Sequence, residues 1–417
     1  MPFPWQLSNF SEKRQMSPNS EPVSHLLKEK CDWIISQTEQ FASGKFWWLK
    51  VFLLCVCFSI LFSGGIDSGL GDRGGYPESY FQKIDHPLLD VTKIYGINSH
   101  DANINFRLTV PVLLHLAGIH NHWSLPILTI LAICSILVTS CILAYHITGD
   151  RVCACFIALN VSATYVGSFG FIWYYDAIAI CQLALACLPR MPWWGRGILV
   201  FTASFTDERA WVASSLLLVG SFFLSGNQQN IFTRIRNPNF LAVAGGMLSY
   251  GLVRLALVKY AGLSQVTGGN GPGNWVVNCS YLHAAIWFSL EGGWLFYLLA
   301  VGALFLRRQF WEGTTLVFAS LCFLGFALMI GDVLRSTIYI FPLLFICLNV
   351  VRQNETLPVF RIYCLLAFLI SALGGNYNVY LGKITWFQPL LIHWLQTGLR
   401  TAYVWVYHLL PHTMPPS

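Results

Sequence analysis

Apolar stretches of about 20 residues recur along this chain from Phe46 almost to the C-terminus, separated by short polar breaks. That length is what an α-helix needs to cross a hydrocarbon core of roughly 30 Å. In lipid the backbone must satisfy its own hydrogen bonds, which only helices and closed barrels can do. Because these runs are continuous and lack the alternation of barrel strands, the sequence predicts an all-α, polytopic transmembrane helical bundle.

The composition excludes most other classes of protein. Only 11% of the residues are charged, against roughly 25% in an average soluble domain. The net charge is +6, but the basic residues are scattered through short loops and form no long basic run. We therefore expect the lipid bilayer as a partner and no nucleic acid.

The apolar runs predict about 11–13 membrane segments. The stronger ones lie at residues 46–64, 122–146, 152–170, 174–188, 195–206, 209–225, 238–258, 281–305, 313–331, 336–350 and 360–375. Two weaker ones follow at residues 384–398 and 401–411. Residues 104–118 have too short an apolar run for a full crossing, so we expect a half-helix or an interfacial helix there.

The domain organisation follows from these segments. We expect a polar leader at residues 1–45, within which residues 22–41 can form an amphipathic surface helix. The leader lacks the basic-then-apolar pattern of a signal peptide, so the first span is expected to stay as an uncleaved anchor. A transmembrane domain over residues 46–411 includes a long outer loop at residues 64–105, and residues 412–417 form a tail.

Lysine and arginine are unevenly divided between alternate loops. If the N-terminus is cytoplasmic, fifteen of the 25 basic residues lie on the cytoplasmic side and eight on the other. Cytoplasmic loops of membrane proteins carry such an excess. The N-terminus is therefore predicted to be cytoplasmic.

Acidic residues run the other way, and this is the main functional signal. Eleven of the nineteen fall at or near the outer face: Asp67, Asp72, Glu78, Asp85, Asp90, Asp101, Asp176, Asp207, Glu208, Glu291 and Asp332. Topology does not require this, because acidic residues contribute little to orientation. A site that needs carboxylates on the outer face would explain it, whereas the plainer alternative for the outer loop is a solvated segment lying on the membrane.

Two junctions between apolar runs concentrate charge. In FTDERAW, residues 205–211, Asp207 can simply cap the following helix, but Glu208 and Arg209 beside it are better satisfied by a polar cavity. In GDVLRSTIYIFP, residues 331–342, Asp332 and Arg335 are three apart and can pair on one helix face. Alternatively, Arg335 holds a lipid-linked phosphate, because a guanidinium matches phosphate oxygens.

Three further features have a plain and a functional interpretation. Glu291 lies about ten residues into its span, or roughly 15 Å along a helix, which is deep for a carboxylate. Asp176 follows a Trp-Tyr-Tyr run and is interpreted only as a marker of the membrane interface. The glycine-rich residues 268–275 can cradle a phosphate, but they lack Walker spacing, so a lid or a plain loop is the favoured interpretation.

The ordered set GGYPESYFQKIDHPLLD, HDANINFRLTVPVLLHLAG, FTDERAW, EGGWLF and GDVLRSTIYIFP, which covers most of residues 64–345, resembles bacterial multispanning proteins of the glycosyltransferase C-type (GT-C) superfamily. In that group a Gly-Gly-Tyr-Asp-type loop, an Asp followed by Arg, an acidic pair opening a helix and a late Asp-x-x-Arg occur in this order. The resemblance implies a GT-C-like fold in the bacterial inner (plasma) membrane.

The resemblance also implies a reaction. A carboxylate of the first outer loop would act on the acceptor, and the sugar would come from a polyprenyl-phosphate donor. Asp101 and Arg107 match the family's Asp and Arg. Pro77 stands where the group has Asp, so either Glu78 or Asp67 replaces that carboxylate, or the chain is not an active transferase.

The predicted site therefore has two sets of residues. Asp101, Asp67, Glu78 and Glu208 are the catalytic candidates; Arg107, Arg335, Asp332, Glu291, Asp207 and Arg209 are the candidates for binding substrate and phosphate. The acceptor is a glycan, a lipid or a protein. A divalent cation is compatible with so many carboxylates, but no ligand spacing requires one.

The competing hypothesis is a multispanning transporter or flippase for a lipid-linked or small polar substrate. In it Glu291, Asp207, Glu208 and Asp332 would line a path near mid-membrane. Transporters typically carry internal repeats and spread polar groups through the membrane depth. Here we find no convincing repeat, and the charges gather at one end, so the transferase is preferred. A non-catalytic membrane subunit is a third alternative.

Overall fold

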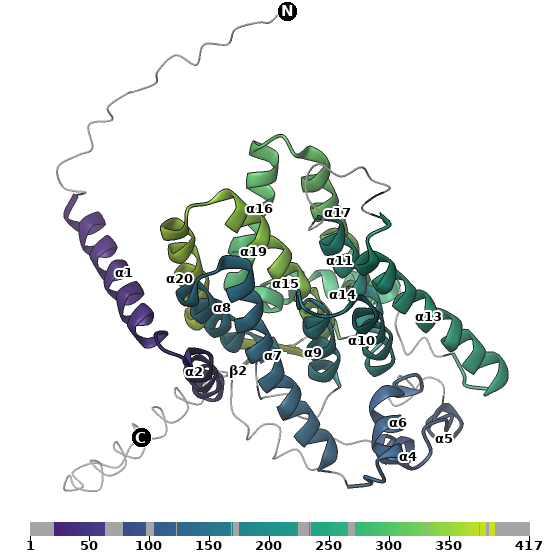
Figure 1. The fold of residues 1–417 in the computed structure, drawn as a ribbon. Helices are drawn as coiled ribbons and strands as arrows, with labels where there is room; N and C mark the ends of the chain where they lie inside the picture. The colour runs from purple at the N-terminus through teal and green to yellow at the C-terminus, as the bar shows by residue number, and fades with distance from the viewer. Residues whose placement is uncertain are drawn as a thin grey trace, which may run out of the picture.

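The computed structural model describes residues 21–62, 78–96, 104–121, 123–167, 169, 175–223, 233, 235–265, 272–330, 332–374, 376–380 and 383–387. Helices dominate them (Figure 1). In chain order the elements are α1 (Glu21–Phe41), α2 (Trp47–Phe62), α4 (Glu78–Asp85), α5 (Thr92–Tyr95), α6 (Thr109–Leu116), α7 (Ser124–Thr148), α8 (Arg151–Ala163), η2 (Tyr165–Gly167), α9 (Asp176–Ala186), α10 (Trp193–Thr206), α11 (Arg209–Phe223), α13 (Pro238–Tyr260), α14 (Pro272–Cys279), α15 (Leu282–Leu290), η4 (Glu291–Gly293), α16 (Trp294–Leu306), α17 (Phe310–Leu328), α18 (Val333–Thr337), η5 (Ile338–Ile340), α19 (Pro342–Asn354), α20 (Leu357–Gly374), β1 (Asn376–Tyr380) and β2 (Lys383–Phe387).

Five helical stretches of the described chain are long and apolar enough to cross a membrane. They are α7, α13, the α15–η4–α16 stretch, α17, and the stretch from α18 to α19. Four shorter apolar helices accompany them, in α2, α8, α9 and α20. This confirms the helical fold class and is compatible with an integral membrane protein. The expected 11–13 crossings, the cytoplasmic N-terminus and the GT-C-like arrangement stay predictions.

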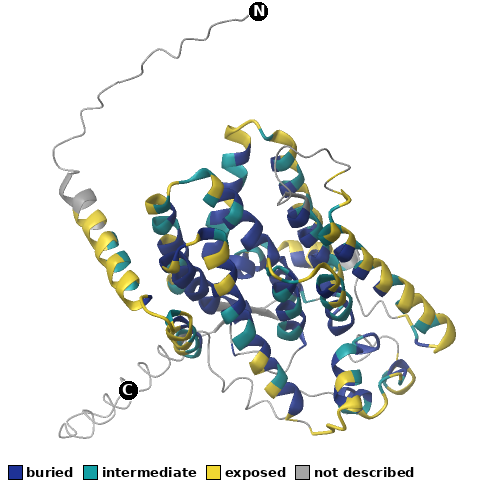
Figure 2. Ribbon diagram, in the orientation of Figure 1, coloured by how far each residue is buried: buried dark blue, intermediate teal, exposed yellow. Residues whose placement is uncertain are grey.

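The core is formed around α8 and the α18–α19 stretch. Twelve of the thirteen residues of α8 are buried, and the helix packs against α7, α20 and α2. In contrast, α13 exposes large aliphatic side chains such as Leu248, Leu252 and Leu255. Figure 2 shows this division, with buried residues in the middle and exposed ones along α13 and α1. An exposed apolar stripe of this kind is what a lipid-facing helix presents.

Small residues let α10 and α13 approach closely. A Cβ on Gly246 would lie 2.5 Å from the carbonyl oxygen of Gly197, and one on Gly197 would lie 2.9 Å from that of Ala242. Membrane helices commonly pack through such small residues, because van der Waals contact replaces the hydrophobic effect in lipid. This contact fixes α10, whose C-terminal end carries Asp207.

The segment boundaries correct the sequence predictions in two places. The expected span at residues 152–170 ends as a helix at Ala163, because Thr164 has extended backbone and η2 follows. The weaker segment at residues 384–398 was expected as a helix, but its first residues belong to β2. Tyr377 of β1 lies opposite Trp386 in this antiparallel hairpin, and aromatic and β-branched residues favour such strands. Residues 388–411 lie outside the described chain.

Other boundaries agree with expectation. The leader contains the helix α1, close to the expected residues 22–41. The segment at residues 104–118 forms only the short helix α6. Of the expected outer loop, residues 78–96 are described and contain α4 and α5. Figure 1 shows α4, α5 and α6 grouped beside the ends of α7 and α13, at the end of the molecule opposite the α16–α17 turn.

Asp90 connects the group formed by α4, α5 and α6 to the rest of the bundle. Its carboxylate accepts hydrogen bonds from the Thr92 hydroxyl at 2.6 Å, the Ser264 hydroxyl at 2.7 Å and the Asn105 amide at 3.1 Å. Burial alone would raise the pKa of Asp90, but the hydrogen bonds from Thr92 and Ser264 outweigh it and hold the pKa below its usual range. Asp90, one of the acids predicted for the outer face, therefore has a structural role.

Lys83 supports the same connection from within α4. Its Nζ donates to the carbonyl oxygens of Pro87 at 2.9 Å and Asn105 at 2.8 Å. Burial lowers the pKa of Lys83 to about 8, against the opposing effect of the Asp90 carboxylate. A neutral amine still has two N–H donors for these two acceptors. The outer loop is thus ordered by buried polar contacts.

Replacing Asp90 tests this role. The Asp90→Ala variant should speed hydrogen exchange at the amides of Thr92 and Ser264, because the hydrogen bonds to the carboxylate are lost. We expect a local loss of about 2 kcal/mol, typical of a charged hydrogen-bond acceptor. Asp85→Ala is the matched control: its side chain is 56% exposed, and such surface changes stay within about 0.5 kcal/mol. Equal exchange in both variants would contradict the assignment.

Candidate functional site

Six charged side chains, alternately basic and acidic, form a continuous series of ion pairs where several helices end or begin. We call this series the ionic chain. In order of contact it consists of Arg107, Asp207, Arg209, Asp176, Arg335 and Asp332. Its members come from segments more than 200 residues apart in the sequence, namely the turn before α6, the start of α9, the α10–α11 junction and the start of α18.

The α10–α11 junction supplies the middle of the ionic chain. Asp207 ends α10 in extended backbone, and its Oδ1 accepts from the backbone N–H of Arg209 at 3.0 Å. The guanidinium of Arg209 then folds back onto the same carboxylate, with Nε donating to Oδ1 and Nη2 to Oδ2, both at 2.7 Å. Asp207 is thus the C-cap of α10, binds the first backbone N–H of α11 and is also an ion-pair partner; its role as the N-cap of α11 stays a prediction.

Asp176 joins the two halves of the ionic chain. It is the first residue of α9, where the helix dipole favours a negative charge. Its carboxylate pairs with Arg209 at 2.5 Å and with Arg335 at 3.4 Å. It also accepts from the Tyr339 hydroxyl at 3.3 Å, and the Arg209 guanidinium lies 5.2 Å from the centre of that ring. Three elements therefore depend on one carboxylate.

The two ends of the ionic chain are more open than its middle. At one end Asp332 caps α18 and pairs with Arg335, as the sequence predicted. At the other, Arg107 pairs with Asp207 at 3.1 Å and donates to the Tyr80 hydroxyl at 3.4 Å. The Asp332 side chain is 26% exposed and those of Arg335 and Arg107 are each 11% exposed, whereas that of Asp207 is fully buried.

A separate pair lies next to the Arg107 end. Glu208 points away from the ionic chain and accepts from Arg254 of α13 at 2.5 Å. Arg254 also donates to the Tyr250 hydroxyl at 2.6 Å and lies 4.2 Å from the centre of the Phe106 ring. The Glu208 side chain is 34% exposed, which makes it the most accessible carboxylate beside the chain. Glu208 and Arg209, adjacent in sequence, thus serve different contacts.

The charges of the ionic chain balance, with three arginines facing three aspartates. Burying an unpaired charge is prohibitive, so each member requires its neighbours. One donor is nevertheless unused: Arg107 Nε is buried and has no hydrogen-bond partner among the described residues. The ionic chain is therefore saturated in its middle, and among the described residues one buried donor stays unused at its Arg107 end.

The structure brings together most of the predicted binding residues. Arg107, Asp207, Arg209, Asp332 and Arg335 all belong to the ionic chain, and Glu208 lies beside it. Of the other candidates, Asp67 and Asp101 lie outside the described residues. Glu78 is the first residue of α4, and its side chain is not described.

Glu291 stands apart from the predicted group. No ion pair or hydrogen bond links it to the ionic chain within the described residues. It lies at the α15–α16 break and is 1% exposed.

Sequence reasoning missed three members of the site. Asp176 was interpreted as an interface marker, yet it is the acid with the most partners; Arg254 and Tyr339 were not singled out. The available signal for Asp176 was its position at the start of an apolar helix. For Arg254 the signal was an arginine within an apolar run, a group that must find a partner in or near the membrane.

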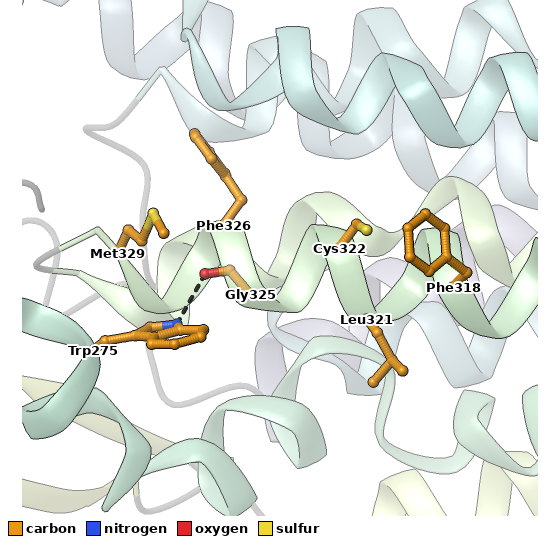
Figure 3. Close-up of a pocket in the computed structure, with 7 residues that line it drawn as sticks. All are labelled: Trp275, Phe318, Leu321, Cys322, Gly325, Phe326 and Met329. Carbon is orange, nitrogen blue, oxygen red and sulfur yellow. Dashed lines mark hydrogen bonds between the residues drawn. The ribbon is translucent and has the colours of Figure 1, made fainter. Parts of the chain in front are cut away.

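An apolar hollow of about 500 Å³ lies along α17, lined by Trp275, Phe318, Leu321, Cys322, Gly325, Phe326 and Met329. Figure 3 shows Trp275 of α14 at the Met329 end of this hollow, where its indole N–H donates to the carbonyl oxygen of Gly325, at 3.1 Å. Asn278 of α14 donates to the carbonyl oxygens of Leu328 and Ile330, both at 2.8 Å. These bonds satisfy backbone carbonyls at the C-terminal end of α17 and just after it.

Metal binding finds no ready site in the part of the chain that is described. No three His, Cys, Asp or Glu side chains come together there as metal ligands. The carboxylates of the ionic chain each face arginine instead. The arrangement therefore suits a bound anion better than a bound cation.

Comparisons of the chain with protein-family models, with curated proteins and with solved structures find no match.

Replacing Arg209 tests the ionic chain. The Arg209→Met variant keeps much of the side chain's length but leaves Asp207 and Asp176 as excess buried negative charges. Breaking a buried pair in this way costs about 3–5 kcal/mol, so we expect a large drop in melting temperature in detergent. Arg254→Met is the control, because the Arg254–Glu208 pair is partly exposed and such pairs contribute about 1 kcal/mol or less. If Arg209→Met melted at the wild-type temperature, the ionic chain would not stabilise the fold.

Proposed function

We propose that this protein is a membrane glycosyltransferase of the GT-C type. It transfers a sugar from a polyprenyl-phosphate donor to a glycan, lipid or protein acceptor on the extracytoplasmic face of a bacterial inner membrane. The observation that carries the proposal is the ionic chain, a balanced charge cluster that has Arg107 at one end and Arg335 next to the other end. These two arginines are less buried than Arg209. Arginine binds phosphate oxygens through paired N–H donors.

The chemistry assigns the two kinds of residue separate roles. A carboxylate takes the proton of the acceptor hydroxyl, whose oxygen then attacks the anomeric carbon of the sugar. The bond between that carbon and the phosphate oxygen breaks, and the lipid phosphate leaves with the electron pair. Arg107 or Arg335 stabilises the charge that develops on it. Glu208, the accessible carboxylate, and Asp101, matched to the family's acid, are the candidate bases.

The hollow on α17 supports a lipid-linked donor. It is lined by apolar side chains and ends at Met329, three residues before Asp332 in the sequence. An isoprenoid chain lying there would follow α17 toward the start of α18, where Arg335 lies. The same helix thus leads from an apolar surface suited to a lipid tail to a guanidinium suited to its phosphate.

A transporter or flippase is the second candidate, and one observation favours it. The long α15–η4–α16 stretch is interrupted at Glu291, which places a carboxylate at a helix break. Transporters use broken helices at their binding sites. The partly exposed charges, however, gather at the ionic chain instead of following a path from Glu291, so the transferase is preferred.

Three substitutions test the proposed reaction: Asp101→Ala, Glu208→Ala and Asp332→Ala, each in cells that carry no other copy of the protein. If either carboxylate is the base, its loss should reduce the glycan or glycolipid product about a hundredfold or more. Loss of Asp332 removes the cap of α18 and the ion-pair partner of Arg335. It should also lower the amount of product. Profiles of extracted glycans and glycolipids measure the effect.

The comparison requires equal protein levels, measured by immunoblot of the membrane fraction. Asp85→Ala is the matched control, since Asp85 is an exposed acid of the same outer group whose partner is His120. It should leave the profile unchanged. Wild-type profiles for all three test variants would eliminate the transferase.

A further inference from the structure

Glu291 is the described carboxylate whose surroundings are hardest to reconcile with a negative charge. It is 1% exposed, and both of its carboxyl oxygens are buried without a hydrogen-bond partner among the described residues. Its backbone has φ 46° and ψ −118°, a region that L-residues rarely adopt. Unusual backbone held in place by its surroundings often marks a functional position.

The backbone at Glu291 is held by close packing against α20. A Cβ on the next residue, Gly292, would lie 1.8 Å from the carbonyl oxygen of Ala367, so only glycine permits this approach. The Gly292 N–H donates to Ser371 Oγ at 2.9 Å, and the Ser371 hydroxyl donates to Asn160 Oδ1 of α8 at 2.9 Å. Ser371 therefore lies beside the carboxyl but gives its proton to Asn160.

Among the residues that the structure describes, no charged group forms an ion pair with this carboxyl. The elements around the break are α15, α16, α20, α8 and α19. Their titratable and charged groups are His283, Tyr297, Arg361, Tyr363, Cys364, Arg151, Cys153, Cys155, Cys347 and Arg352. None of these forms a hydrogen bond or an ion pair with the Glu291 carboxyl. Arg361 instead binds Asp150 at 2.6 Å.

We propose that Glu291 is a binding site for one proton in the interior of the helical bundle, formed by the α15–α16 break with Ser371 and Asn160. An ionised carboxylate without a donor or a counter-ion is prohibitive in such surroundings. A neutral carboxyl has one O–H donor, and Ser371 Oγ has a second lone pair that can accept it. The proton thus completes a chain from Glu291 through Ser371 to Asn160.

A metal ion fits the same place less well. The Ser371 oxygen and Asn160 Oδ1 are already used, and the nearby Ile286 carbonyl accepts from Trp294 and Ser289. Few oxygens remain for a cation that requires about six. The one unused donor is Asn160 Nδ2. Loss of the proton would draw the carboxylate toward that amide and change the packing of η4 against α20, which makes the site a switch between two arrangements.

This proposal is independent of the glycosyltransferase reaction. Infrared difference spectra of the full-length protein in lipid nanodiscs, wild type minus Glu291→Gln, test it directly. At neutral pH we expect the C=O stretching band of a protonated carboxylic acid, and this band should disappear in a one-proton titration as the pH rises. The control difference, wild type minus Asp150→Asn, should contain no such band, because Asp150 is held ionised by Arg361.

The melting temperature gives a second readout. If the native protein keeps this proton above the ordinary glutamate pKa of about 4.3, the unfolded chain binds fewer protons, so wild-type stability falls as the pH rises. The wild-type unfolding constant should then increase by up to about tenfold per pH unit relative to Glu291→Gln. The advantage of the Gln variant should grow from pH 5 to pH 8.

Other outcomes overturn the proposal. A carboxylate signal at neutral pH, with Glu291→Gln less stable than wild type at every pH, would show that the group is ionised. Removal of the protonated band by sodium or lithium at constant pH would show a metal-ion site. If the Gln variant does not accumulate, Ser371→Ala should shift the frequency of the band, because the acid loses its acceptor; an unshifted band would contradict the proton site.

Discussion

The organisation of the bundle around the ionic chain depends on the mutual neutralisation of buried arginine and aspartate. Each charge is unstable alone in an apolar bundle, so the elements that carry these charges must meet. Asp176 shows this most clearly, because it receives Arg209 from α11, Arg335 from α18 and the hydroxyl of Tyr339 from η5. Segments far apart in the sequence thereby converge on one carboxylate.

The acids predicted for the outer face differ in what they contact. The Asp90 carboxylate accepts hydrogen bonds that connect α5 to the segment after α13. Asp207 and Asp176 form ion pairs with arginine inside the ionic chain. Glu208 and Asp332 are partly exposed, so they remain available for chemistry. The count of charges by loop thus grouped acids that serve structural contacts with acids that are partly exposed.

Local patterns predicted what local physics controls. Apolar run length predicted the helices, and the spacing of Asp332 and Arg335 predicted their pairing. Partners across the fold could not be predicted, because nothing in the sequence near Asp176 indicates Arg209 or Arg335. The β2 strand was missed since an apolar run of its length suits a helix or a strand, and only its pairing with β1 decides between them.

Glu291 is a second example of a residue whose partners could not be predicted from the sequence. Its depth in an apolar run was evident from the sequence, but its isolation from every charged partner was not. The close approach of Gly292 to α20 creates that isolation. A carboxyl that looked like part of a phosphate site therefore belongs to a different part of the bundle, with Ser371 and Asn160 as its polar neighbours.

The central claim is that Arg107 or Arg335, the arginines toward the two ends of the ionic chain, holds a lipid-linked phosphate. Native mass spectrometry of the purified protein can compare a polyprenyl phosphate with the polyprenol of the same chain length. Charge-assisted hydrogen bonds contribute about 1.5–3 kcal/mol each, so the phosphate should bind at least about tenfold more tightly. Loss of the guanidinium that holds the phosphate, in Arg107→Met or in Arg335→Met, should abolish that preference while leaving polyprenol binding unchanged. Equal binding of the phosphate and the alcohol by the wild-type protein would contradict the claim.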